Sequence, residues 1–268
     1  MELKRLRKEA GLNLDEVAKQ LGVHASTISR MESGDRGLKR DDLAAVLVIY
    51  GATRKLRMAM LHLYDHAEQP GLLDNTDLVL PDSLVALVGF EEDATSIRNY
   101  ETLLIPGLAQ TIPYARAVIE GSGLPLEDEE MDDRLVARVG RQSLLRRRNA
   151  PMVRLLINEA ALRQNIGGPE VMRGQLEYLV ELRGRLNIRV VPTATGPHPG
   201  LGSAFTILDY EFLASLVAIE NKVSTLYLDD AEHVAPYKLA FDGILAAALS
   251  VDASVELIRR ISDELPLR

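Results

Sequence analysis

The chain has 268 residues, of which 47% are hydrophobic, and a formal net charge of -8. This length and composition predict a soluble globular protein with two domains. The sequence contains no cysteine, which excludes disulfides, thiolate metal sites and cysteine nucleophiles. It also lacks an apolar run of about 18 residues and an apolar signal segment, so we expect a cytoplasmic protein with no membrane partner.

Residues 1–66 have the spacing of apolar side chains that is typical of short amphipathic helices. They are expected to form an all-α domain of five helices, followed by a linker at residues 67–77 that contains Pro70 and Gly71. The expected helices lie at about residues 2–10, 14–21 and 25–32, then in a segment that Asp41 or Asp42 caps and that ends near Gly51, and finally from Thr53 onward.

The second and third of these helices carry the signals of a helix-turn-helix. Asn13 is a good N-cap for the first helix of the pair, and Glu16, three residues later, completes a capping box. Gly22 ends that helix, because glycine takes a positive φ at no steric cost. His24 is expected to cap the next helix. Such a pair places the N-terminal end of its second helix in the major groove of DNA.

The N-terminal end of the helix at residues 25–32 therefore supplies the expected contacts with double-stranded DNA. Its residues are expected on or near the outward side, where serine and threonine can bond to base edges and arginine can pair with guanine or hold a phosphate. The loop that follows a turn starting at Glu32 is expected to pass the phosphate backbone. The expected DNA-binding residues are His24, Ala25, Ser26, Thr27, Ser29, Arg30, Arg36, Lys39 and Arg40.

The segment LDEVAKQLGVHASTISRMESG, residues 14–34, resembles the xenobiotic-response-element family of helix-turn-helix regulators, which includes the phage lambda and 434 repressors. The resemblance implies a lambda-repressor-like fold and a DNA-binding role for the first domain. Leu14 departs from the pattern, because the family usually has a glutamine there that reaches a phosphate, and that contact is not expected. The alternative is a five-helix domain that packs against a protein partner and has lost DNA binding.

The charge of the chain is divided unevenly along its length. Residues 1–66 carry 12 Lys and Arg against 9 Asp and Glu, whereas residues 67–268 carry 19 against 30. Phosphate groups repel an acidic body, so this division is expected to turn the N-terminal domain toward a duplex.

Residues 78–268 are expected to form an α+β domain with a mixed sheet. A helix at 82–95 is followed by an apolar segment that contains tyrosine, residues 97–108, and a hairpin is expected around Asn221 and Lys222. The other expected helices lie at 108–119, 127–148, 169–183, 230–249 and 252–264, and the expected strands at 152–158, 187–193, 203–210, 213–220 and 224–230.

Three residues of this second domain are candidate ligand contacts, namely Tyr100, Tyr114 and His198. A loop histidine such as His198 can bind a ligand or hold a turn, and the alternative for the tyrosines is hydrogen bonding in the core. His62 and His66 have the spacing of metal ligands on a helix, but no third ligand is evident, so no metal site is expected. No catalytic residue and no cofactor are assigned, because the glycine stretches lack the lysine and hydroxyl of a phosphate loop.

Four segments of the second domain are similar to a large actinobacterial group of these regulators, whose C-terminal domain has no characterised function. The resemblance implies a transcriptional regulator that is often encoded beside a small partner protein. The segments are IRNYETLLIPGLAQTIPYARAVI, RQSLLRR, NEAALRQNIGGPEVMRGQLEYL and VVPTATGPHPGLGSAFTIL.

The sequence therefore predicts a DNA-binding regulator, a homodimer on a palindromic operator, whose C-terminal domain senses a ligand or a partner protein. The alternative is an antitoxin-like interaction module that binds a small neighbouring protein. An enzyme with a DNA-targeting domain is a third hypothesis, for which no catalytic constellation is visible.

Overall fold

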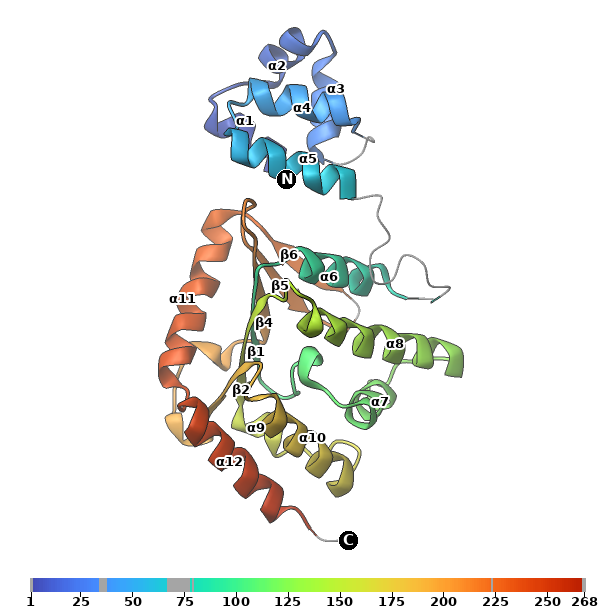
Figure 1. Ribbon diagram of the computed structural model, residues 1–268, viewed down its shortest axis with the longest axis vertical. Coiled ribbons are helices and arrows are strands. Elements are labelled where there is room, and N and C mark those ends of the chain that lie inside the picture. The colour runs from blue at the N-terminus through green and yellow to red at the C-terminus, as the bar shows by residue number, and fades with distance from the viewer. Residues whose placement is uncertain (1, 34–37, 67–77, 79, 223, 267–268) are drawn as a thin grey trace. The chain divides into compact units, whose positions relative to one another are not determined.

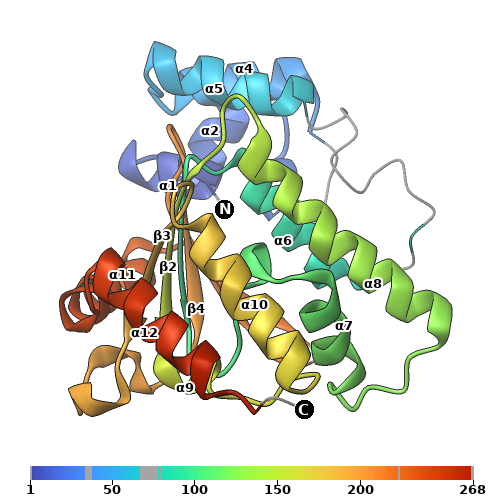
Figure 2. The same ribbon diagram turned by 60° about the horizontal axis from the view of Figure 1, so that its bottom comes forward.

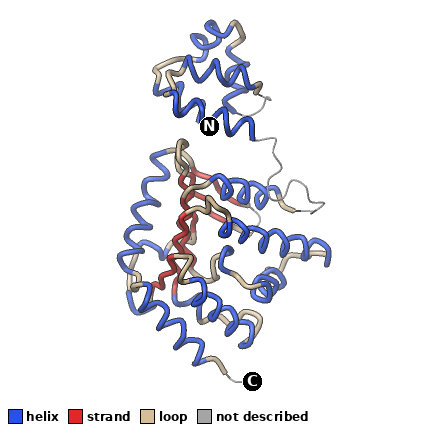
Figure 3. Tube along the Cα trace, viewed as in Figure 1, coloured by secondary structure: helices blue, strands red, loops and turns tan. Residues whose placement is uncertain are grey.

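The computed structural model describes residues 2–33, 38–66, 78, 80–222 and 224–266. They fall into two units, the first built of helices and the second of helices and a sheet (Figure 3). The expected linker at residues 67–77 lies outside the described residues. Among the described helices, none is long and apolar enough to cross a membrane.

The first unit confirms the expected all-helical plan (Figure 1). Its helices pack around one apolar core, in which Val17, Ile28 and Leu47 have no exposed surface. These three side chains come from three different helices, so one core fixes the helix pair against the rest of the unit. The helices are α1 (Glu2–Glu9), α2 (Leu14–Leu21), α3 (Ala25–Ser33), α4 (Arg40–Ile49) and α5 (Arg54–His66).

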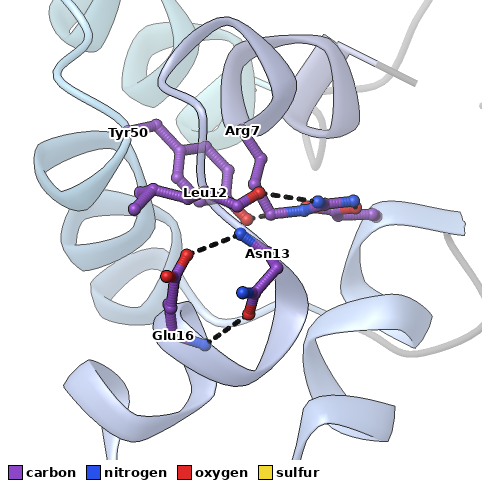
Figure 4. A network of polar contacts seen from close by, with 6 residues as sticks. Arg7, Leu12, Asn13, Glu16 and Tyr50 are labelled. Carbon is purple, nitrogen blue, oxygen red and sulfur yellow. Dashed lines mark hydrogen bonds and ion pairs between the residues drawn. The ribbon is translucent and has the colours of Figure 1, made fainter.

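The signals expected at the ends of these helices are largely confirmed. The Asn13 side chain accepts a hydrogen bond from the Glu16 backbone N–H at 2.9 Å, and the Glu16 carboxylate accepts from the Asn13 N–H at 2.8 Å (Figure 4). This capping box satisfies two backbone donors at the start of α2. Gly22 ends α2 with a φ of 67°, and Thr53 Oγ1 accepts from Leu56 N–H at the start of α5.

The expected cap of α4 at Asp41 or Asp42 is wrong. The helix begins at Arg40, and Lys39 is its N-cap residue without a side-chain capping bond. Both aspartates lie in the first turn, where their negative charge interacts favourably with the helix dipole. Charge, rather than a side-chain hydrogen bond, therefore stabilises this helix start.

The described residues of the second unit form a six-stranded mixed sheet, which confirms the α+β class. Its order is β3-β2-β1-β4-β5-β6. The first three strands of the chain run parallel, whereas β4, β5 and β6 are each antiparallel to the preceding neighbour in the sheet. The expected hairpin at Asn221 and Lys222 joins β5 to β6. The strands are β1 (Ser96–Glu101), β2 (Met152–Asn158), β3 (Asn187–Val191), β4 (Phe205–Asp209), β5 (Leu216–Glu220) and β6 (Thr225–Leu228).

Helices cover both faces of this sheet (Figures 1 and 2). One face packs against α11 (Ala231–Ala247) through Phe241 and Ile244, and the other packs against α7 (Ile112–Glu120) and α10 (Pro169–Leu182). The remaining helices are α6 (Asp82–Asp93), α8 (Asp128–Gly140), α9 (Glu159–Leu162) and α12 (Val251–Glu264). Short 3-10 helices lie at Gly107–Ala109, Arg141–Arg146, Thr193–Thr195 and Pro199–Leu201.

The centre of the sheet differs from the sequence expectation. Residues 97–108 are expected only as an apolar segment, yet β1 occupies the middle of the sheet between β2 and β4. Successive side chains of a strand point to opposite faces, so Ile97, Asn99 and Glu101 share one face of β1 while Tyr100 lies on the other. Three ionisable or amide side chains in a central strand, Arg98, Asn99 and Glu101, conceal its strand character from a pattern based on apolar residues.

Candidate nucleic-acid interface

A buried ion pair holds α3, the second helix of the helix-turn-helix. Glu32, in the last turn of α3, is 6% exposed, although the sequence pattern places it in a turn. Its carboxylate accepts hydrogen bonds from Arg7 Nε at 2.8 Å, Arg7 Nη2 at 3.0 Å and the Tyr50 hydroxyl at 2.7 Å. Arg7 lies on α1 and Tyr50 follows α4, so one carboxylate ties α3 to two other helices.

Arg7 also bonds to the backbone between α1 and α2. Arg7 Nη1 donates to the Leu12 carbonyl oxygen at 3.0 Å, in the connection between α1 and α2 (Figure 4). Burial, together with the hydrogen bond to Glu32, raises the pKa of Tyr50, so its hydroxyl stays protonated and remains a donor. The guanidinium and the hydroxyl compensate the buried carboxylate, as a buried charge requires.

The structure places most of the expected DNA-binding residues of α3 at the surface. Ser26, Ser29 and Arg30 are exposed, as is His24 just before the helix. The His24 carbonyl oxygen accepts the Thr27 N–H at 2.8 Å, so His24 contributes its backbone to the start of α3. Ala25 is partly buried against the core of the unit.

Thr27 does not lie on the outward side, and that expectation is wrong. Its side chain is buried, together with Ile28, Met31 and Glu32 on the inner face of α3. Thr27 precedes Met31 by four residues, a spacing that puts both on one face of a helix. The exposed face of α3 is therefore narrower than the sequence predicts, and in the first two turns it carries Ser26, Ser29 and Arg30. We call the exposed side chains of Ser26, Ser29 and Arg30 the reading face.

Arg30 is held along the surface of its own helix. Its Nε donates to the Ser26 carbonyl oxygen at 3.2 Å. That bond uses one of the five N–H groups of the guanidinium, and the terminal nitrogens that form bidentate pairs with guanine do not take part in it. No acidic residue lies in the first turn of α3, so nothing in that turn repels phosphate.

The expected phosphate contacts Lys39 and Arg40 are both exposed at the N-terminal end of α4. Arg36 lies outside the described residues. Leu14, which stands in place of the glutamine that the resemblance implies, is partly buried against the core of the unit. The first position of α2 therefore contributes packing in this chain.

The three candidate ligand contacts of the second unit are not brought together. Tyr114 is fully buried, and its hydroxyl oxygen accepts the Ile105 N–H at 3.1 Å. Burial raises the pKa of Tyr114 to about 12. Tyr114 packs on the face of the sheet opposite to Tyr100, so the two tyrosines cannot contact one ligand.

Tyr100 and His198, in contrast, are neighbours. Their rings meet edge to face with centroids 6.2 Å apart, and His198 Nδ1 accepts the Gly200 N–H at 3.1 Å. A Cβ on Gly200 would lie 2.5 Å from the Tyr100 ring, so the loop needs a glycine to approach the tyrosine. This geometry favours the interpretation that His198 holds a turn. The side chains of His62 and His66 lie outside the described set, and the described residues contain no group of three potential metal ligands.

Comparison with known families assigns the two parts of the chain separately. A family model described as a helix-turn-helix domain matches residues 1–60, and one described as a domain of unknown function (DUF5753) matches residues 84–260. The first match covers the helices that carry the capping box, the glycine turn and the reading face. The second covers the whole sheet and more than half of the chain. A search of curated proteins finds no match.

Proposed function

Because the chain belongs to the family of the domain of unknown function DUF5753 and carries a helix-turn-helix domain ahead of it, we propose that it is a transcription regulator that recognises a specific DNA sequence. In this proposal the protein binds a palindromic operator as a homodimer, and its C-terminal domain senses a ligand or a partner protein. The observation that carries the proposal is the reading face on a helix that a buried ion pair fixes.

The residues have distinct roles in this proposal. Arg30 reads a base edge through its terminal nitrogens, and Ser26 and Ser29 bond to neighbouring base edges or phosphates. Lys39 and Arg40 neutralise phosphates and set the register on the duplex. One module of this size buries only about 600 to 1,000 Å² on DNA, so two copies related by a two-fold axis reach a longer and more specific site.

The phosphate contacts are tested by the salt dependence of DNA binding. Each phosphate contact releases counterions and adds about 0.9 to the slope of log affinity against log salt concentration. We expect Lys39→Ala and Arg40→Ala each to reduce the slope by about that amount, measured by fluorescence anisotropy with the full chain and a random-sequence duplex.

A matched control is Arg259→Ala, which removes an exposed arginine on α12 of the second unit. It should leave the slope unchanged. Slopes equal to wild type in both the Lys39 and Arg40 variants would remove these residues from the interface.

A further inference from the structure

The second unit contains a cavity at the point where the strand order of its sheet reverses. The chain passes from β1 to β2 and β3 on one side, and β4 then lies on the other side of β1. The cavity has a volume of about 180 Å³ and is lined by one face of β1, the segment that follows it (residues 104–110), the start of β4, the end of β5, and residues of α6 and α8. The carboxyl ends of β1 and β5 lie at the same edge of the sheet, because β4 between them is antiparallel to both.

One ion pair in the cavity wall is complete without a ligand. Arg141 donates to Glu91 through Nε at 2.8 Å and through Nη2 at 2.6 Å, and both side chains are buried. A bidentate pair of this kind satisfies both groups. This pair forms a fixed part of the wall. Three other charged side chains also line the cavity.

Those three side chains are Glu101 on β1, Arg138 on α8 and Glu220 on β5. All line the cavity, and among the described residues none of them forms an ion pair. The Glu101 carboxylate accepts only a hydrogen bond of 3.4 Å from Asn99, and Arg138 Nη1 donates to Gln110 Oε1 at 3.4 Å. Both contacts are near the limit of a hydrogen bond, so the charges of Glu101 and Arg138 are poorly compensated, whereas Glu220 is an exposed residue at the rim.

The electrostatics of the cavity agree with this geometry. Burial, and to a smaller extent the negative charge of Glu220, raises the pKa of Glu101 to about 7. Burial and the positive charge of Arg141 lower the pKa of Arg138. The charged forms of both groups are thus disfavoured, and a bound molecule with the opposite charges would stabilise them.

A second hollow of about 560 Å³ adjoins the cavity, with which it shares the lining residues Leu104, Arg138 and Glu220. Its wall includes the apolar side chains of Val118, Ile119 and Leu124, and Arg134 and Lys222 also line it. A cavity of about 150 Å³ is enough for a benzene-sized molecule. The inner cavity therefore has room for a small charged head group, and the outer hollow for an apolar side chain.

We propose that this cavity binds an amino acid with an apolar side chain. Its ammonium group lies between Glu101 and Glu220, its carboxylate lies on Arg138, and its side chain extends into the outer hollow. A regulatory role for this amino acid rests on the proposed function, in which the C-terminal domain senses a ligand. Binding of the amino acid to the cavity does not depend on DNA.

Binding is measured by isothermal calorimetry at pH 8 with the full chain. The probes are L-leucine and L-phenylalanine, the amines that lack the carboxylate (isoamylamine and phenethylamine), and the acids that lack the ammonium (4-methylpentanoate and 3-phenylpropanoate). We expect at least one amino acid to bind and its amine and acid to bind about tenfold or more weakly, since each loses one charge pair. No binding of either amino acid, or equal binding of the matching amine or acid, would overturn the proposal.

Two variants test the residues directly. Glu101→Gln keeps the shape of the side chain and relieves a buried charge, so it should fold at least as well as wild type while losing about tenfold or more in affinity. Arg138→Gln should lose as much. The matched controls Glu177→Gln and Arg259→Gln, at exposed positions on α10 and α12, should bind as wild type does. Unchanged affinity in either cavity variant would contradict the assignment.

The pH dependence gives a further test. The groups that face Glu101 are Glu220, Arg138, Arg141 and Tyr114. Burial raises the pKa of Glu101 to about 7. The ammonium needs the ionised carboxylate, so affinity should rise about tenfold between pH 6 and pH 8 as the competent fraction increases. Glu101→Gln should remove this rise, and a rise that persists in the variant would contradict the role of Glu101.

Adding the bound amino acid to a DNA titration separates this proposal from the proposed function. A change in DNA affinity that Glu101→Gln abolishes supports both. Binding of the amino acid by a protein that binds no DNA supports the cavity assignment and contradicts the regulatory role.

Discussion

At the scale of single residues, Glu32 holds the helix that carries the reading face. It contacts no nucleic acid in the proposal, but three hydrogen bonds from Arg7 and Tyr50 end on its carboxylate. A buried charge with good partners fixes one geometry and is costly to disturb. The orientation of α3 therefore depends on a side chain that faces away from DNA.

Replacement of this carboxylate tests its contribution to stability. Glu32→Gln leaves the Arg7 guanidinium without a counter-charge, so we expect the free energy of unfolding to fall by about 3 kcal/mol. Glu9→Gln is the matched control, because Glu9 forms an exposed pair with Arg5 on α1 and should cost at most about 1 kcal/mol. Chemical unfolding of the full chain, monitored by circular dichroism, measures the free energy of unfolding of both variants. Equal losses in the two would contradict a stabilising role for the Glu32 network.

The inward and outward positions of α3 were only partly predictable from the sequence. Ile28 and Met31 mark the inner face of α3. Thr27 lies four residues before Met31, and Glu32 lies four residues after Ile28, so the helical repeat puts both on that face. Polarity is what conceals them, since threonine and glutamate are usually exposed. Their partners Arg7 and Tyr50 lie 25 and 18 residues from Glu32, and no local pattern reveals such contacts.

At the scale of elements, the helix-turn-helix depends on the turn between α2 and α3. Gly22 has a φ of 67°, and a Cβ there would meet nothing within 4 Å. The requirement for glycine is therefore one of backbone conformation and not of space. A side chain at this position strains the turn that sets the angle between the two helices.

This turn provides a clean test by substitution. Gly22→Ala forces a residue with a Cβ into the left-handed region, so we expect a loss of about 1 to 2 kcal/mol in the free energy of unfolding. Gln20→Ala introduces the same side chain at an exposed position two residues earlier in α2 and should change stability by less than about 0.5 kcal/mol. Unfolding midpoints in urea compare the two variants, and a Gly22→Ala protein as stable as wild type would contradict the role of the turn.

Most elements follow from local signals, and the main exception is the central strand β1. The strand expected at 152–158 agrees with β2, and Pro169 starts α10 as a proline at the first turn should. The central strand β1 was missed because Asn99 and Glu101 interrupt its apolar pattern. Both line the proposed amino-acid cavity, so the segment that departs most from a core strand is the one proposed to carry a site.

At the scale of the whole molecule, the cavity residues could not have been grouped from the sequence. Glu101, Arg138 and Glu220 are far apart along the chain, yet all three line one cavity. β1 and β5 end at the same edge of the sheet, and α8 lies on one side of that sheet (Figure 1). The order of the strands creates this proximity, and no local pattern predicts that order. The uneven distribution of charge along the chain, in contrast, follows directly from the sequence.

That division affects how the protein is expected to meet DNA. Residues 1–66 have an excess of positive charge and residues 67–268 an excess of negative charge. Long-range electrostatics of this kind favour approach by the basic part and reduce non-specific binding by the acidic part. In the proposal, sequence recognition then depends on the reading face, where Arg30 is the side chain best suited to a base.

Selection of bound duplexes from a random pool tests the central claim most directly. The full chain is compared with Arg30→Ala and, as a control, with Arg259→Ala. We expect wild type and the control to enrich the same palindrome, with half-sites about one helical turn apart, and Arg30→Ala to lose the preference at one base of each half-site, about 1 to 3 kcal/mol of affinity. No enrichment by wild type, or the same motif from Arg30→Ala, would contradict the proposal that α3 reads DNA.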